Sequence, residues 1–132
     1  MSLTNFARNK ILDKNFGGVA YTEPSSFFVG LSTTQISTTG SNATEPSGAG
    51  YARVEIPNDK SSFSYAASGC VVNNNVVNFV ISSGSWGTIV NAGLWDNLTS
   101  GSLWYFTSLS PVKVVQDATI ISISTSALAI SM

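Results

Sequence analysis

The sequence contains no histidine, a single cysteine and few charged residues. Its 132 residues include only 6 basic and 7 acidic side chains. Without histidine the chain has no side chain that titrates near pH 7 at its unperturbed pKa, and no imidazole metal ligand. Cys70 lacks a partner for an intrachain disulfide and lies far in sequence from any cation that would activate it, so we expect a small buried side chain. We therefore predict no catalytic, cofactor-binding or metal-binding residue, and the composition favours a structural or binding protein over an enzyme.

The near-balance of charges excludes two further classes of function. A net charge of −1 leaves no basic surface to neutralise the phosphates of a nucleic acid. No run of about 20 apolar residues could span a membrane, and the first residues lack the apolar core and cleavage site of a signal peptide, so we expect synthesis in the cytoplasm. With 43% hydrophobic residues, residues 1–132 are expected to fold as a single domain.

One helix is predicted, within residues 1–18. Ser2 or Thr4 can cap its first turn, and Gly17 and Gly18 can end it. The helix either covers one end of a β core or docks a partner, and we favour the first interpretation because an apolar stripe is needed in both cases. The stripe consists of Leu3, Ala7, Ile11, Leu12 and Phe16.

From Pro24 onward, apolar and polar residues alternate in short runs separated by turn residues. This pattern predicts an all-β fold, a jelly-roll-like β-sandwich of about 7–9 short antiparallel strands over residues 19–132, in addition to the N-terminal helix. Residues 70–72 and 76–81 are expected to form a hairpin, and Pro111 is expected to break a strand. Residues 32–50 are rich in Ser, Thr, Gly, Asn and Pro and predict a long exposed loop, which is either a contact with a subunit or partner or simply disordered.

Two kinds of chemistry are compatible with this composition. A glycosidase needs only two carboxylates, but each candidate lies beside a turn or in a surface strand, where a solvated carboxylate is the ordinary outcome. These candidates are Glu23, Glu45, Glu55, Asp59, Asp96 and Asp117. Aromatic residues could instead form a platform for carbohydrate, although in alternating strands they are expected to lie in the core. The platform candidates are Trp86, Trp95, Trp104 and Tyr105.

Several segments together match a known pattern. They are the helix from Leu3 to Asp13, the strand Phe28–Thr33, the turn Glu45–Val54, and the segments Ser85–Ile89 and Ala92–Asp96. The chain resembles a family of small tailed-bacteriophage structural proteins, whose members show a helix, a "vGLST" strand, an "EPSGgGYAR" turn and a "WGT…GifD" strand pair. The resemblance covers nearly all 132 residues, and the Gly-Tyr-Ala-Arg and Trp-Gly-Thr combination is its most specific part.

The resemblance implies a virion component without enzymatic activity and assigns architectural roles to the matching residues. The glycines of the turn would redirect the chain, and Tyr51 and Trp86 would anchor the core. Arg53 would tie a loop or a neighbouring subunit through its fork of donors. Trp95 departs from the family pattern, in which a smaller apolar residue is commoner. The matching structural residues are Gly48, Gly50, Tyr51, Trp86, Gly87 and Gly93.

The resemblance makes a capsid decoration (cement) protein the leading hypothesis: a homotrimer, made in the bacterial cytoplasm, that binds the major capsid protein on the capsid exterior where capsomers meet. The alternative is a tail or fibre component that binds host-surface glycans. Exposed tryptophans would favour the alternative, and buried tryptophans the decoration protein. No cofactor, nucleic acid or membrane is an expected partner. The candidate assembly interface comprises Leu3, Phe6, Arg8, Lys10, Gln35, Ile36 and Arg53.

Overall fold

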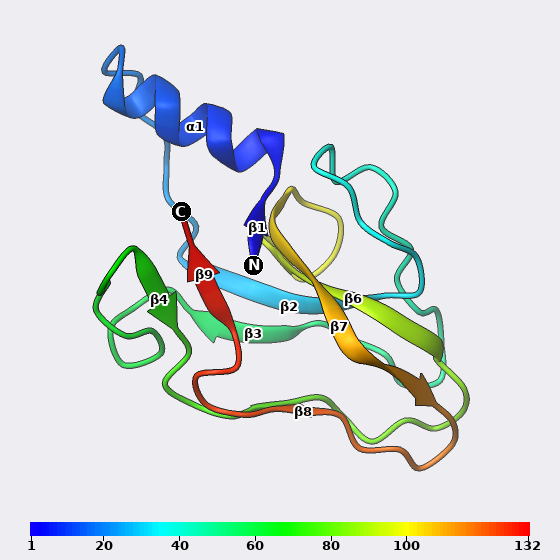
Figure 1. The fold of residues 1–132 in the computed structure, drawn as a ribbon. Coiled ribbons are helices and arrows are strands. Elements are labelled where there is room, and N and C mark those ends of the chain that lie inside the picture. Colours follow the sequence, from blue (N-terminus) through cyan, green and yellow to red (C-terminus); the bar gives the residue numbers. More distant parts are fainter.

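The computed structural model describes all 132 residues and contains one helix and nine strands (Figure 1). The all-β class, the N-terminal helix and the number of strands are as predicted. The helix is α1 (Asn5–Asn15), and the strands are β1 (Ser2–Leu3), β2 (Ser26–Ser32), β3 (Val54–Pro57), β4 (Cys70–Val72), β5 (Val77–Asn78), β6 (Gly87–Trp95), β7 (Leu103–Val115), β8 (Ser122–Ile123) and β9 (Ala129–Ser131).

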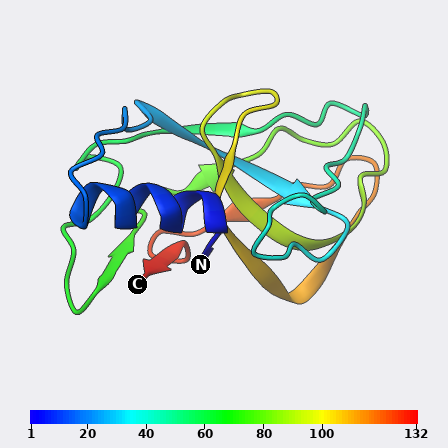
Figure 2. The ribbon, with the colours of Figure 1, turned by 90° about the horizontal axis from the view of Figure 1, so that it is seen from above.

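The strands form one large sheet and two small ones. The large sheet has the order β1-β7-β6-β2-β3, and β4 pairs with β9 and β5 with β8 in two-stranded sheets. Every pair is antiparallel. The small sheets lie across the core from the large one, as the two perpendicular views show (Figures 1 and 2). A jelly roll distributes eight strands over two sheets, so the finer jelly-roll description is not confirmed.

Each face of the large sheet carries its own cluster of buried side chains. The main cluster fills the space between the large and small sheets with 16 buried residues, among them Val29 of β2, Leu94 of β6 and Val77 of β5. Trp95 follows Leu94 and points to the opposite face because side chains alternate along a strand. There it packs with Ile36 and Leu103 in a smaller cluster. The segment between β2 and β3 therefore covers the second face of the sheet.

The predicted hairpin of residues 70–81 is wrong. Val71 of β4 pairs with Ile130, and Val77 of β5 pairs with Ile123, so both segments pair with the end of the chain and not with each other. The buried Asn73 between them explains this arrangement. Its Nδ2 donates to the Ser124 carbonyl at 3.0 Å, and its Oδ1 accepts from the Leu128 amide at 2.9 Å. This side chain fixes the C-terminal segment where a hairpin partner would lie.

Pro111 does not break its strand. β7 continues through it to Val115, because the pairing with β6 jumps from Asn91↔Ser108 to Ile89↔Lys113. The residues between Ser108 and Lys113 form a bulge opposite a single residue of β6. Proline is tolerated in a bulge since no ladder hydrogen bond is needed from it there.

The segment predicted as an exposed loop is better ordered than its composition indicates. The first residue of that range, Ser32, still belongs to β2. Beyond it, the Thr33 amide donates to the Thr44 carbonyl at 2.9 Å, and the Ser37 amide donates to Asn42 Oδ1 at 2.8 Å. Ile36 is buried against the sheet. The hydrogen bonds and the buried Ile36 hold this segment in place, although few of its other side chains are apolar.

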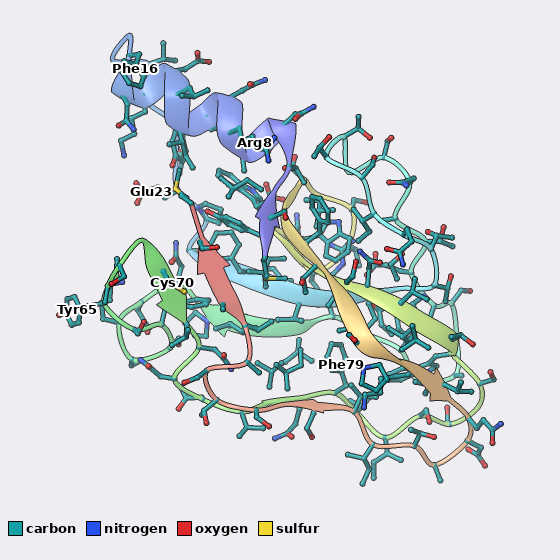
Figure 3. The ribbon with its side chains drawn as sticks, viewed as in Figure 1. Arg8, Phe16, Glu23, Tyr65, Cys70 and Phe79 are labelled. Atoms are coloured by element: carbon teal, nitrogen blue, oxygen red, sulfur yellow. The ribbon has the colours of Figure 1, made fainter.

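Helix α1 begins as predicted at Thr4, whose hydroxyl accepts from the Ala7 amide at 3.3 Å. Only Ala7 is buried in the helix, whereas Leu12 and Phe16 of the predicted stripe are exposed. The helix projects from the sheets, and Phe16 lies at its far tip (Figures 1 and 3). It therefore does not cover an end of the core along its length. No helix of the structure is long and apolar enough to cross a membrane.

Candidate functional site

The largest depression on the molecule is a groove of about 630 Å³. One wall is α1, the other is the segment that leads into β2, and Trp104 of β7 lies between them. We call it the aromatic groove. It is lined by Phe6, Lys10, Ala20, Tyr21, Thr22, Glu23, Pro24, Ser25, Asp96, Asn97 and Trp104.

Three aromatic rings give the groove its shape. The indole of Trp104 is 4% exposed. The Phe6 ring meets it edge-on with centroids 5.2 Å apart, and the Tyr21 ring is tilted against it at 5.7 Å. Asp96 fixes the orientation of the indole, because its Oδ2 accepts from Trp104 Nε1 at 3.0 Å while its Oδ1 accepts from the Ser102 amide at 2.7 Å. Phe6 and Tyr21 therefore both pack on the Trp104 indole, whose orientation is fixed by Asp96.

Two lysines of α1 place their ammonium groups over the rings of Phe6 and Tyr21. Lys10 Nζ lies 5.5 Å from the centroid of Phe6, and Lys14 Nζ lies 5.2 Å from that of Tyr21. Lys14 also forms a 2.9 Å ion pair with Glu23, whose hydrogen bond and charge raise the pKa of the ammonium group. Both partners are exposed, so this pair contributes little to stability. Its effect is to place a cation and an anion beside Tyr21.

The groove combines apolar ring faces with amide, carboxylate and ammonium groups. Ring faces pack against the C–H face of a sugar, and the polar groups around them can bond its hydroxyls. No group of three carboxylate or thiol side chains gathers anywhere in the structure to form a metal site.

The tryptophans named from the sequence do not form a platform. Trp86, Trp95 and Trp104 are 3%, 5% and 4% exposed, so the expectation that they lie in the core is confirmed. Tyr105 is half-buried, and burial raises the pKa of its hydroxyl. The aromatic walls of the groove are instead Phe6, which is 38% exposed, and Tyr21, which is half-buried. Tyr21 was missed because it follows the helix in an irregular segment, where no periodicity marks it.

The candidate interface residues divide into a buried and an exposed group. Leu3, Ile36 and Arg53 are buried within the chain, so the structure does not present them to a partner. For Leu3 and Ile36 the reason is packing against the two core clusters. The remaining members are Phe6, Arg8, Lys10 and Gln35, which are exposed or half-exposed. Their role in assembly stays a prediction.

Arg53 is the centre of an internal polar network. Its Nε and Nη2 donate to the two carboxylate oxygens of Glu45 at 2.9 and 2.6 Å, and its Nη1 donates to the carbonyls of Asn97 and Ser100 at 2.6 and 2.7 Å. The guanidinium carbon lies 4.3 Å from the centroid of Trp95. Arg53 thus connects two loops of its own chain. Of the two roles predicted for it, contact with a loop or with a neighbouring subunit, the structure shows the first.

Several residues of the predicted motif lie in turns or in aromatic contacts. Gly48 and Gly50 have φ angles of 73° and 78°, which turn the chain in a region that favours glycine. Tyr51 meets Trp86 edge-on at 5.3 Å, and Trp86 Nε1 donates to the Ala49 carbonyl at 2.8 Å. Gly87 also has a positive φ, 81°. This turn therefore locks the segment before β3 onto the start of β6.

The end of α1 and the residues that follow it form a second exposed surface. Leu12 of α1 is 53% exposed, and Phe16 and Val19, which follow the helix, are 84% and 58% exposed. Large apolar side chains exposed together commonly mark a contact with another protein. Ala7 and Ile11 of the same stripe pack against the main core cluster, so the first part of the stripe covers the core and docking by its end stays a prediction.

Comparison with known proteins gives one result. The family model described as Podophage GP4 fiber I protein gp80 matches residues 2–131. No curated protein matches the sequence.

Proposed function

This chain belongs to the family of the Podophage GP4 fiber I protein gp80, since the family model matches nearly its whole length, and from that premise we propose that it is a non-enzymatic subunit of a phage fibre that binds host-surface glycans. Membership makes it a fibre-type structural protein of a tailed phage. The finer proposal concerns its place in the fibre and its ligand.

The family description supports the fibre over the capsid exterior. The burial of all three tryptophans, which the sequence argument took as favouring a decoration protein, removes only one way of binding glycans. Buried tryptophans do not exclude a glycan-binding fibre, because Phe6 and Tyr21 of the aromatic groove can take the place of exposed tryptophans. We therefore give the family match the greater weight.

In this proposal α1 attaches the subunit to its neighbour in the virion. The helix contacts its own chain through Ala7, Ile11 and Lys14, whereas Leu12 and, just past its end, Phe16 are exposed to solvent. Burial of such side chains contributes about 1.5–3 kcal/mol each, which is a substantial part of the free energy of a modest interface. Arg8 and Lys10 lie on the same helix and can select an acidic neighbour.

The aromatic groove would bind the glycan. The observation that carries this part is the pair of ring faces, Phe6 and Tyr21, held by the buried Trp104 beside the carboxylate of Asp96. Stacking on the rings would supply affinity, and hydrogen bonds to the polar lining would select among sugars.

Location is tested by labelling purified virions with an antibody against the chain and by measuring its copy number relative to the major capsid protein. We expect label on a fibre and a low ratio. Label spread over the head, at a ratio close to that of the shell subunit, would overturn the fibre proposal and restore the decoration hypothesis.

Glycan binding is tested on an array of bacterial surface polysaccharides with the wild-type chain, Tyr21→Ala and Tyr65→Ala. Tyr65 serves as the control because it lies 5.3 Å from Lys60 as Tyr21 lies 5.2 Å from Lys14, and because it does not line the groove. Tyr65 is 78% exposed whereas Tyr21 is half-buried, so circular dichroism verifies that Tyr21→Ala folds. Figure 3 shows Tyr65 on the periphery of the fold. We expect Tyr21→Ala to lose binding about tenfold or more and Tyr65→Ala to retain it. Equal loss in both variants, or no binding by the wild type, would contradict the role of the groove.

A further inference from the structure

A group of branched apolar side chains is exposed at the end of the molecule opposite α1. We call it the β7-end patch. Its members are between 48% and 66% exposed. They are Val80, Ile81, Val112, Val114 and Ile120.

Backbone hydrogen bonds bring these residues together from three parts of the chain. The Phe79 amide donates to the Ile121 carbonyl at 3.0 Å, and the Ser82 amide donates to the Thr119 carbonyl at 3.1 Å. The segment that follows β5 is therefore aligned with the segment that precedes β8. Val114 and Ile120 line the same depression of about 170 Å³ at the end of β7. Val80 and Ile81 therefore lie on the segment next to that of Ile120, which in turn shares a depression with Val114.

The patch adjoins an unpaired strand edge. β1 pairs with β7 only at Tyr105 and Phe106, so no strand of the chain covers that side of β7 from residue 107 to its end. Residues 110–114 are all exposed, on both faces of the strand. This edge carries a bulge with Pro111, and also Lys113, features that hinder the addition of another strand to the sheet. A contact at this end of β7 would therefore form through its exposed branched side chains and not by extension of the sheet.

Here the charges come as a complementary pair. Lys113 lies in the exposed end of β7 and Asp117 in the turn that follows, and neither forms an ion pair within the chain. A surface with one unpaired cation and one unpaired anion is complementary to itself under two-fold symmetry. The net charge of −1 means that two copies hardly repel each other.

We propose that the β7-end patch is the contact between two copies of this chain. The copies meet through the exposed end of β7, bury the branched apolar side chains, and bring Lys113 of each copy to Asp117 of the other. The contact lies at the opposite end of the molecule from α1 (Figure 1), and none of its residues lines the aromatic groove, so each copy keeps both free for a neighbour and a ligand. The proposal does not depend on the identity of the ligand.

The first test measures the mass of the purified chain by light scattering over a range of concentrations. We expect the mass to rise toward that of an oligomer in the wild type. Val114→Glu and Ile120→Glu should weaken association about tenfold or more, because each buries a carboxylate without a partner. Leu98→Glu is the matched control, since Leu98 is 50% exposed but lies in the turn between β6 and β7, away from the patch.

Exchange of the two charges distinguishes a specific contact from non-specific hydrophobic association. Lys113→Asp and Asp117→Lys should each weaken association, because they place like charges opposite each other, and the double variant should restore it. Circular dichroism verifies that every variant folds. A monomeric wild type at its highest soluble concentration, association that the patch variants leave unchanged, or a double variant no better than either single one would overturn the proposal. An interface with a different protein would give the first of these results.

Discussion

Gly30 of β2 lies directly opposite Gly93 of β6, and the indole of Trp95 fills the space above both. A Cβ on Gly30 would lie 2.6 Å from Trp95 Cζ3, and a Cβ on Gly93 would lie 2.9 Å from the same atom. The two glycines therefore form a shallow seat in the sheet for the ring. The guanidinium of Arg53 also lies over this ring, so the glycines, the indole and the ion pair with Glu45 form one packed unit.

Gly30→Ala should destabilise the fold by about 1–3 kcal/mol, because the added methyl group overpacks a rigid ring. Urea unfolding measures the loss. Gly17→Ala is the control, since a Cβ there would meet the Asp13 carbonyl at 3.4 Å and Val19 Cγ2 at 3.9 Å, both ordinary contacts. Trp95→Leu is destabilising by itself because it removes a buried indole, but the double variant should lose less stability than the sum of the two single losses. Additive effects of the two substitutions would contradict a direct contact between the added methyl group and the Trp95 ring.

Arg53→Lys should destabilise the fold by about 3 kcal/mol. A lysine cannot form the two parallel bonds to Glu45 and at the same time reach the carbonyls of Asn97 and Ser100. Thermal or urea unfolding measures the change. Lys14→Ala breaks the exposed pair with Glu23 and should leave the midpoint of unfolding almost unchanged, because an exposed pair contributes little to stability. Similar losses in the two variants would argue against a structural role of the buried network.

The elements with regular periodicity were predictable from the sequence. β2 and the helix cap at Thr4 follow directly from alternation and from a capping residue before a stripe. The partners of β4 and β5 were not predictable, because a buried Asn73 selects the C-terminal segment over the local hairpin. The choice depends on contacts between residues about 50 positions apart, which no local pattern records.

The candidate site was predictable only in part. Glycine, tyrosine and arginine of the turn were identified through the resemblance, and the structure explains them by tight turns and an internal ion pair. The aromatic groove was not, because Tyr21 and Asp96 come together only when the irregular segment after α1 passes the turn between β6 and β7. The exposure of Leu12 and Phe16 was also not predicted. Periodicity identifies the apolar face of a helix but does not show which part of the protein packs against it.

Asn91→Leu should stabilise the protein by about 1–2 kcal/mol. Asn91 is 1% exposed, and neither its Nδ2 nor its Oδ1 has a hydrogen-bond partner in the chain. An apolar side chain of similar volume removes the desolvation cost of both atoms. A higher midpoint of urea unfolding would bear this out, and Asn73→Leu is the contrasting control because it breaks the bonds to Ser124 and Leu128. Destabilisation by Asn91→Leu would mean that the amide is paired in solution.

Tyr51→Phe should change how stability depends on pH. Burial raises the pKa of the Tyr51 hydroxyl above its usual value of 10.0, so the folded chain holds this proton more tightly than the unfolded chain. The corresponding stability is fully present below about pH 10 and is lost as the pH rises from there toward the folded pKa.

The variant should be less stable at neutral pH, because the hydroxyl donates to Glu45 at 2.7 Å and accepts from the Leu31 amide at 2.9 Å. A cost of about 1–3 kcal/mol is expected for leaving these buried partners unpaired. Above pH 10 its stability should fall less steeply than that of the wild type, with the remaining slope due in part to Tyr105, whose pKa is also raised by burial. Urea unfolding at several pH values from 8 to about 11 measures both effects. The two stability curves should therefore converge as the pH rises, whereas parallel curves would show that Tyr51 does not couple folding to its own ionisation.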